Sequence, residues 1–231
     1  MSAIYIIPTP IGNLGDITLR SLETLKNVDR VYAEDTRVTQ KLLKHYDIKQ
    51  KLYSYHQHNE HKIVDKIIED IIKEDIEIAI VSDAGTPGIS DPGFLLINRA
   101  KENNISCFCF PGPTALIPAI VQSGFPTDEF YFAGFLPHKK GRKKKLSQLV
   151  ELSTTVILYE SPYRLMKLLG ELKDYLPNQQ QISVSREITK VYEENIRGSV
   201  KEVFNYFENK KIKGEIVLVI EKATKTNKQT E

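Results

Sequence analysis

Two short polar clusters in the sequence carry side chains that can transfer protons. The segment Ala33-Glu-Asp-Thr-Arg37 holds two acids and an arginine, and the segment His56-Gln-His-Asn-Glu-His61 holds three histidines and an acid. Carboxylates and imidazoles are common general acids and bases in enzymes. Each cluster follows a short apolar run that we predict to be a strand, so both are candidates for chemistry at the edge of a sheet.

The histidines also raise the question of a metal site, because His56 and His58 can share one side of an extended chain. We favour solvated loop histidines instead. Asn59 has the residue type of a helix cap, and His61 would then lie in the first helical turn. Nothing else supplies a dedicated ligand set, so no metal is expected.

Three loops rich in glycine and proline each follow a predicted strand, where parallel sheets commonly bind ligands. The glycines of the first loop, 8–16, suggest a dinucleotide site. However, the loop lacks the Gly-x-Gly-x-x-Gly pattern, and it has prolines where phosphate-binding amides would be needed. A plain turn before a helix capped by Asp16 is the alternative, and the loop by itself leaves both open.

The second loop, 82–93, contains three glycines, two prolines and two aspartates. It is no phosphate loop, because no Gly-Lys-Ser/Thr follows. Its stiffness suits a surface that holds a ligand, which we favour over a rigid connector in which Asp91 caps the next helix. In the third loop, 111–115, small residues would let a ligand approach a helix start closely.

The charge is balanced overall but uneven along the chain. Thirty-two basic and 30 acidic residues give a net charge of +2, which does not by itself indicate a nucleic-acid partner. The segment 138–145, however, holds six Lys/Arg residues and no acid. We favour contact with a polyanion over a merely solvated helix face, with Arg164, Arg186, Lys190 and Arg197 extending the patch.

Short apolar runs alternate with amphipathic stretches, which predicts an α/β protein with a mostly parallel sheet covered on both sides. The predicted strands are 3–7, 28–33, 50–55, 76–82 and 105–110, and then 130–135, 154–159, 181–186 and 214–221. The predicted helices are 17–26, 37–46, 61–74, 93–103, 114–123, 141–152, 162–175 and 199–209. A cluster of Gly, Pro and Thr-Asp near 124–128 places a boundary between two α/β domains, 1–125 and 126–231, with a ligand cleft expected between them.

Length and composition limit the class of protein. With 231 residues, 41% hydrophobic and 27% charged, the chain is an ordinary globular protein rather than a disordered, collagen-like or coiled-coil one. Cys107 and Cys109 are expected to be inert buried thiols. No signal peptide or long apolar segment is visible, so a soluble cytoplasmic protein is expected. The polar tail after Glu221 is expected to fray.

Together the loops resemble one family, the tetrapyrrole-methylase superfamily of S-adenosylmethionine-dependent methyltransferases. The resemblance is closest to its members that 2′-O-methylate a cytidine ribose in the decoding region of small-subunit (16S) rRNA. The matching segments are 9–18, 33–37, 56–60, 82–93, 111–112, 123–124, 134–137, 159–162, 186–190 and 213–215. The resemblance implies a class III methyltransferase fold of two α/β domains with the cofactor between them, a homodimer, and the 16S rRNA of the small ribosomal subunit as partner.

The resemblance also implies site residues. Those expected to bind S-adenosylmethionine are Pro10, Gly12, Gly85, Thr86, Ile89, Asp91, Thr114, Ala115, Glu160, Ile188, Gly214 and Glu215. Those expected to contact RNA are Arg37, Asn59, Lys139, Lys140, Arg142, Lys143, Lys144, Arg164, Arg186 and Lys190. A carboxylate or imidazole would help to deprotonate a ribose hydroxyl, and the candidates are Glu34, Asp35, His56 and Glu60, with Asp91 on a further loop.

The sequence departs from the family at two positions, where Val38 and Tyr163 replace frequent histidines, so neither position supplies a base. Longer members also carry a C-terminal segment not seen in this sequence, so RNA contacts are expected elsewhere, such as 139–145. Two other functions stay open: a corrin or porphyrin C-methyltransferase, and a non-catalytic ribosome-assembly factor. The HQHNE and AEDTR segments and the basic run argue against the first, and the intact cofactor loops argue against the second.

Overall fold

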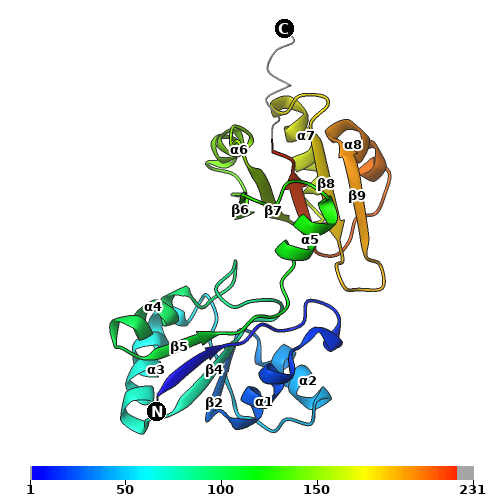
Figure 1. Ribbon diagram of the computed structural model, residues 1–231. Coiled ribbons are helices and arrows are strands. Elements are labelled where there is room, and N and C mark those ends of the chain that lie inside the picture. Colours follow the sequence, from blue (N-terminus) through cyan, green and yellow to red (C-terminus); the bar gives the residue numbers. More distant parts are fainter. Residues whose placement is uncertain (1, 223–231) are drawn as a thin grey trace. The chain divides into compact units, whose positions relative to one another are not determined.

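The computed structural model describes residues 2–222 and divides into two compact units, Met1–Thr114 and Ala115–Glu231 (Figure 1). The tail that was expected to fray begins at Lys222, and its residues 223–231 lie outside the described part of the chain. Within the described part, no helix is long and apolar enough to cross a membrane.

The first unit is a parallel five-stranded sheet with strand order β3-β2-β4-β1-β5. All strands and helices predicted for this part of the chain are present. The strands are β1 (Ala3–Ile6), β2 (Arg30–Ala33), β3 (Leu52–Ser54), β4 (Glu77–Val81) and β5 (Ser106–Cys109). The helices are α1 (Leu19–Asn27), α2 (Thr36–His45), α3 (Glu60–Glu74) and α4 (Phe94–Glu102), with a short 3₁₀ turn, η1 (Leu14–Asp16).

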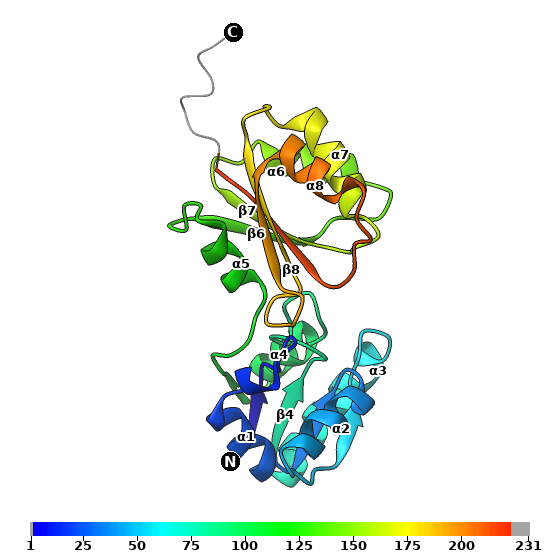
Figure 2. The ribbon, with the colours of Figure 1, turned by 90° about the vertical axis from the view of Figure 1, so that its right-hand side faces the viewer.

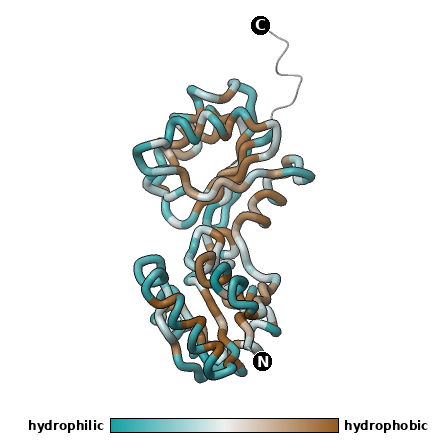
Figure 3. The backbone as a smooth tube through the Cα atoms, turned by 90° about the vertical axis from the view of Figure 1, so that its left-hand side faces the viewer, coloured by the Kyte–Doolittle hydropathy of each residue, from teal (hydrophilic) through white to brown (hydrophobic). Residues whose placement is uncertain are grey.

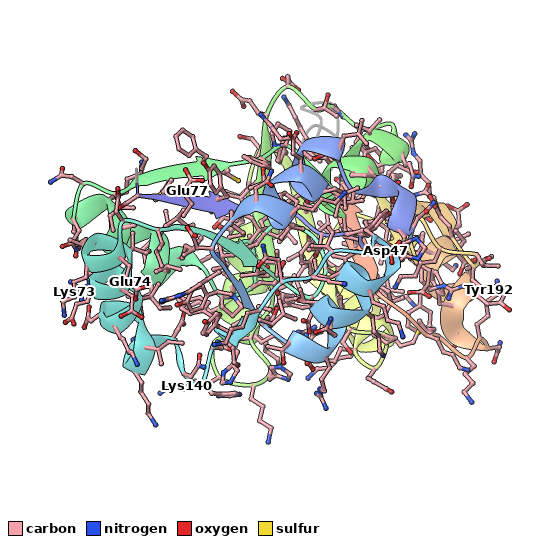
Figure 4. The ribbon with its side chains drawn as sticks, turned by 90° about the horizontal axis from the view of Figure 1, so that it is seen from below. Asp47, Lys73, Glu74, Glu77, Lys140 and Tyr192 are labelled. Atoms are coloured by element: carbon pink, nitrogen blue, oxygen red, sulfur yellow. The ribbon has the colours of Figure 1, made fainter. Side chains whose placement is uncertain are left out.

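Helices cover both faces of this sheet, as the apolar strands require. One core cluster joins Ile4, Ile78 and Ile80 to the apolar stripe of α3 and to α4. The other joins Ala79 and Val81 to α1 and α2. Figure 3 shows the apolar strands in brown, and Figure 4 labels the charged residues Lys73 and Glu74 at the C-terminal end of α3. Successive residues of β4 therefore point to opposite faces of the sheet and pack in different core clusters, as expected for the alternating side chains of a strand.

The prediction that both cysteines are buried is wrong. Both thiols are free, as expected, but Cys109 is exposed and Cys107 only half-buried. The reason is the position of β5 at the edge of the sheet, where one side of the strand has no neighbour. Burial was inferred from the residue type, because free cysteine is commonly buried, and residue type alone does not tell an edge strand from a central one.

The second unit is a mixed five-stranded sheet with strand order β6-β7-β10-β8-β9. Its strands are β6 (Phe130–Phe135), β7 (Thr155–Glu160), β8 (Gln181–Arg186), β9 (Glu194–Ser199) and β10 (Ile216–Ile220), and its helices are α5 (Leu116–Ser123), α6 (Arg142–Val150), α7 (Leu165–Tyr175) and α8 (Val200–Glu208). Only β6 and β7 pair in parallel, whereas β7–β10, β10–β8 and β8–β9 are antiparallel.

The expectation of a second, mostly parallel βα series is therefore wrong for this unit, and strand β9 was missed. The segment 194–199, ENIRGS, is mostly polar and contains a glycine, so it gives no strand signal. It forms a strand because a short turn returns the chain beside β8, where the backbone pairs in register from Gln181 with Ser199 to Arg186 with Glu194.

Helix α5 belongs to the second unit, so the division falls before this helix rather than after it as the predicted boundary had it. The helix packs against β8, β9 and β10, on the face opposite to α6, α7 and α8 (Figure 2). Ser183 and Ser185 of β8 are fully buried on this face. Their small side chains let the helix approach the sheet closely, and Asn195 donates to both hydroxyls at 2.8 Å.

Candidate functional site

The loops after β1 and β4 are joined at the carboxyl-terminal edge of the first sheet. Thr9 and Gly85 exchange two backbone hydrogen bonds, each with an N···O distance of 2.9 Å. The buried Thr9 hydroxyl also donates to the Ser82 carbonyl at 2.9 Å. Thr18, not Asp16, caps helix α1, so that part of the turn-and-cap alternative is wrong. The first two predicted loops therefore form one connected surface.

The third loop, which follows β5, meets the other two. A Cβ atom at Gly112 would lie 2.8 Å from the Cβ of Pro8, closer than two carbon atoms can approach, so only glycine fits there. The Thr86 hydroxyl donates to the Pro113 carbonyl at 3.4 Å. The structure thus brings together the loops that hold the expected residues Pro10, Gly12, Gly85, Thr86 and Thr114.

The loop 82–93 is folded tightly on itself. Gly85, Gly88 and Gly93 have positive φ values of 81°, 85° and 148°, and Ser90 has a φ of 65°. A Cβ atom at Gly93 would lie 2.9 Å from the Gly88 backbone nitrogen. Gly93, rather than Asp91, is the N-cap of α4, so the capping alternative for Asp91 is wrong. Such a loop offers backbone groups and small side chains to a ligand without further ordering.

The acidic residues after β2 and β4 are joined by hydrogen bonds from the backbone of one loop to a carboxylate of the other. The Asp35 backbone N–H donates to Asp83 Oδ1 at 3.0 Å, and the Asp83 N–H donates to Glu34 Oε2 at 3.3 Å. Burial raises the pKa of Glu34 and of Asp83. Asp35 behaves differently, because hydrogen bonds from Arg37 lower its pKa to about 2 and its side chain also caps α2. Glu34 and Asp83 are therefore the carboxylates of this cluster best suited to accept a proton near neutral pH.

The His56–Glu60 segment is organised by internal hydrogen bonds. Asn59 is the N-cap residue of α3, but its side-chain oxygen accepts the His56 N–H at 2.8 Å instead of capping the helix. His56 Nδ1 accepts the His58 N–H at 3.2 Å, which places the proton of the neutral ring on Nε2. Glu60 accepts the hydroxyl of the buried Tyr55 at 3.2 Å. Across residues 2–222, no cluster of three His, Cys, Asp or Glu side chains could hold a metal ion.

In the second unit, one predicted RNA contact is part of a buried ion-pair network. Arg142 is 2% exposed, and its guanidinium donates to Glu171 at 2.8 Å and lies 3.4 Å from Glu160. Glu160 is buried as well and pairs with Arg164 at 2.7 Å. The expectation that Arg142 meets RNA at the surface is corrected: helical periodicity turns this one member of the basic run into the core.

Gly214 and Glu215, two of the predicted cofactor residues, precede β10, and Glu215 is hydrogen-bonded to Glu187, which follows β8. The Glu215 N–H donates to Glu187 Oε1 at 3.1 Å, and the Glu187 N–H donates to the Glu215 carbonyl at 3.0 Å. Gly214 has a φ of 86°, and a Cβ atom there would overlap the Glu187 carboxylate. Ile188, the next residue after Glu187, is buried. Gly214 is thus required by local geometry, whatever else the turn contacts.

The remaining basic residues are exposed or paired with carboxylates, and Arg37 is both, because it is exposed and also pairs with Asp35 at 2.6 Å. The exposed ones are Arg37, Lys139, Lys140, Lys143 and Lys144. Arg186 is paired with Glu194 at 2.7 Å, and Lys190 bridges Glu187 at 2.8 Å and Glu215 at 3.2 Å. Figure 4 labels Lys140 of the first group.

One residue was missed as a candidate base. In the sequence, Asp83 was considered only as one residue of the loop 82–93. It is, however, the first acid after β4, and β4 lies next to β2 in the sheet. Adjacent parallel strands end side by side, so the acid after β4 had to lie near Glu34. The proximity of Asp83 to Glu34 follows from the order of the strands in the sheet, which the sequence of a single loop does not reveal.

Known proteins resemble this chain in sequence and in fold. The model of the family "Tetrapyrrole (Corrin/Porphyrin) Methylases" matches residues 3–203. A protein of Halalkalibacterium halodurans named "Ribosomal RNA small subunit methyltransferase I" is 45% identical over 94% of this chain and 75% of its own length. A protein of Thermotoga maritima with the same name is 42% identical over 95% of this chain and 98% of its own length.

Among solved structures, the cobalamin biosynthetic enzyme cobalt precorrin-4 methyltransferase, CbiF, is similar to this chain with a TM-score of 0.67. The similarity covers 95% of this chain and 94% of that one at 19% sequence identity. At this identity the likeness concerns the fold alone.

Proposed function

The chain belongs to the tetrapyrrole (corrin/porphyrin) methylase family, and from this premise we propose that it 2′-O-methylates a cytidine ribose in the decoding region of small-subunit (16S) rRNA. The chain is a methyltransferase that uses S-adenosylmethionine and acts on rRNA. The observation that carries the proposal is the junction of three loops at the edge of the first sheet, with Glu34 and Asp83 beside it.

The junction fits a cofactor of this kind. Its loops present backbone groups and small side chains, the Thr86 hydroxyl ties two of them together, and Gly112 packs so closely on Pro8 that no side chain fits there. We propose that Pro10, Gly12, Gly85, Thr86, Ile89, Asp91, Thr114 and Ala115 hold it. From the second unit we propose Ile188 and the turn formed by Gly214 and Glu215, with Glu160 acting through the network that fixes its loop.

When bound, S-adenosylmethionine supplies an activated methyl group on a good leaving group, so the protein mainly has to position and deprotonate the acceptor. The ribose 2′-oxygen would take the methyl group as the bond from its carbon to sulfur breaks and S-adenosylhomocysteine leaves, and the hydroxyl proton would pass to a carboxylate of this chain. We assign this role to Glu34, whose raised pKa brings it closer to that of a useful base. Asp83 holds Glu34 in place through its backbone N–H.

The other candidate bases are less suited to the role. Asp35 is neutralised by Arg37, and Glu60 accepts a hydrogen bond from Tyr55. Neutral His56 carries its proton on Nε2, because Nδ1 accepts the His58 N–H, so its free ring nitrogen donates rather than accepts. These interactions favour Glu34 among the four predicted residues.

We propose that RNA phosphates are bound by exposed cations, namely Arg37, Lys139, Lys140, Lys143 and Lys144. Arg142, Arg164, Arg186 and Lys190 are engaged by carboxylates, and Asn59 by its own loop. We therefore propose that these five residues fix their own segments of the chain and do not bind phosphates themselves. We also propose that the protein forms a homodimer and is cytoplasmic, as the family resemblance implies.

The test is transfer of a radiolabelled methyl group to three acceptors: small ribosomal subunits, naked 16S rRNA and a porphyrinogen. The proposal expects label in rRNA, at one cytidine whose ribose resists alkaline cleavage after modification. Label on a base, or on the porphyrinogen alone, would overturn it. The Glu34→Gln protein, matched with Glu60→Gln, serves as control, because only the former is expected to lose transfer to rRNA.

A further inference from the structure

In the part of the chain that the structure describes, the edge strand β5 is covered by a helix of its own unit on only one side. Helix α4 packs against β5 on one face of the sheet, whereas on the other face a groove of about 720 Å³, which we call the β5 groove, lies between β5 and α1. In folds that alternate strands and helices, the helix after a strand normally returns to cover the sheet. The helix after β5 is α5, and it packs in the second unit instead, so the first sheet lacks one covering helix at the β5 groove.

Three aromatic rings form the floor of the β5 groove. They belong to Tyr5, Phe108 and Phe110, and the Tyr5 ring centroid lies 5.7 Å from that of Phe108 and 5.8 Å from that of Phe110. Phe108 is 51% exposed. On the α1 side, the Arg20 guanidinium carbon lies 4.3 Å from the Phe110 ring centroid. An apolar centre with a polar rim is the usual composition of a contact between proteins.

The charges around the β5 groove limit what it can bind. Its charged lining residues are two acids, Glu23 and Glu77, and one arginine, Arg20, and Figure 4 labels Glu77. An RNA strand would meet more negative than positive charge there, so a polyanion is a poor partner. The strand has none of the charges, prolines or bulges that commonly protect an exposed edge, since residues 105–110 are uncharged and β5 pairs with β1 in regular register. The β5 groove therefore suits an uncharged protein surface.

Helix α5 carries such a surface. Its inner face packs on the second sheet through Ala119, Ile120 and Ser123. Its outer face carries Ile117 and Val121, which lie one turn apart and are 45% and 66% exposed. No residue of the helix is charged. A helix with apolar residues on both sides is typically buried on both, so the outer face of α5 lacks a covering surface, as the β5 groove lacks a helix.

We propose that the outer face of α5 packs into the β5 groove of a second copy of this chain. Each copy carries both surfaces, so two copies can exchange the contact in both directions. This closed two-fold arrangement is the commonest among homo-oligomers. A second copy is favoured over an unrelated protein because the strand that lacks a helix and the helix that lacks a cover are consecutive elements of one chain. The inference rests on the homodimer of the proposed function and assigns the surface through which the copies meet.

The experiment measures the dimer dissociation constant of full-chain variants by sedimentation equilibrium. Phe108→Glu places a carboxylate in the β5 groove, and Val121→Glu places one on the outer face of α5. Each is expected to raise the dissociation constant at least about 100-fold, because burial of an unpaired charge is unfavourable. Ile72→Glu on α3 is the matched control, since Ile72 is also an exposed apolar residue, at 53%, and this variant should dimerise as the wild type does.

Mixing the two variants tests the exchange itself. The Phe108→Glu chain keeps a normal α5, and the Val121→Glu chain keeps a normal β5 groove. A mixed pair therefore contains one intact contact, whereas each variant alone contains none. The mixture is expected to form dimers at concentrations at which either variant is monomeric. Both substituted positions are exposed, so the variants are expected to fold, which circular dichroism checks.

Three outcomes would overturn the inference. If either variant dimerises as tightly as the wild type, the homodimer of the proposed function stands and its surface lies elsewhere. If the folded variants stay monomeric after mixing, the copies do not exchange α5. A monomeric wild-type chain would overturn the homodimer and this inference together. No methyl transfer is measured, so a chain that dimerises as expected but methylates no ribose would count against the proposed activity alone.

Discussion

At the scale of single residues, similar side chains have different roles because their partners differ. Glu34 and Asp35 are neighbours in sequence, yet burial raises the pKa of the first while Arg37 lowers that of the second to about 2. Arg142 and Lys143 are also neighbours, yet one is buried in an ion-pair network and the other is exposed. Residue type predicted which side chains could act, and only their partners show which are available.

The first prediction concerns Glu34. Glu34→Gln is expected to lower kcat by about 10²- to 10⁴-fold, the usual contribution of a general base, with cofactor affinity unchanged. The base acts when deprotonated, so wild-type activity should rise with pH through the raised pKa of this carboxyl. Single-turnover rates across pH check this, and the same acid limb in the Gln variant would contradict the assignment.

The second prediction concerns the buried network. Arg142→Met leaves Glu160 and Glu171 without a shared cation in a buried place, so unfolding free energy should fall by about 3–5 kcal/mol. Lys143→Met, one position along the same helix but exposed, should change it by less than about 0.5 kcal/mol. Urea denaturation of both variants measures the difference, and equal values would show that the network adds nothing.

At the scale of elements, the first unit was predicted in full, whereas in the second unit strand β9 and the antiparallel strand pairing were missed. Alternating apolar runs and amphipathic helices specified the parallel sheet, because its central strands β1, β2 and β4 are buried on both faces. Strand β9 escaped prediction because its sequence is polar and its pairing depends on β8, a neighbour only in space. Of the site, the loops could be predicted from their composition, but the interlock of Asp83 with Glu34 depends on strand order.

The loop junction gives the third prediction. Gly112→Ala adds a Cβ atom 2.8 Å from that of Pro8, so the first and third loops must separate. We expect affinity for S-adenosylmethionine to fall by at least about tenfold, which is about 1.4 kcal/mol. Gly170→Ala in α7 is the control, since nothing lies within 4 Å of its added atom. It should bind the cofactor normally and be more stable by about 0.5–1 kcal/mol, because alanine favours helix. Calorimetric titration separates the two variants.

At the scale of the whole molecule, the distribution of charge matters more than its sum. The net charge of +2 gives no reason to expect a polyanion partner, whereas four exposed lysines lie together within 139–144. Electrostatic binding to RNA depends on the number of phosphates neutralised locally, not on total charge.

Salt dependence supplies the fourth prediction. Replacing Lys139 and Lys140 with alanine should reduce the slope of log affinity against log salt concentration by about 0.7 for each phosphate of single-stranded RNA that is no longer neutralised. Lys66→Ala, an exposed lysine of α3, should leave the slope unchanged. Filter binding over a range of potassium chloride concentrations measures both slopes, and parallel lines for all three proteins would exclude these lysines from the interface.

The place of α5 has a consequence for how such chains can be recombined. Its residues Ala119 and Ile120 are buried in the second unit, where the serines of β8 make room for the helix. A chimera of two family members that crosses over after Thr114 inherits helix and sheet from one parent, and their complementary shapes survive. A crossover after residue 125 sets one parent's helix on the other parent's strands, and such hybrids should express in lower soluble yield.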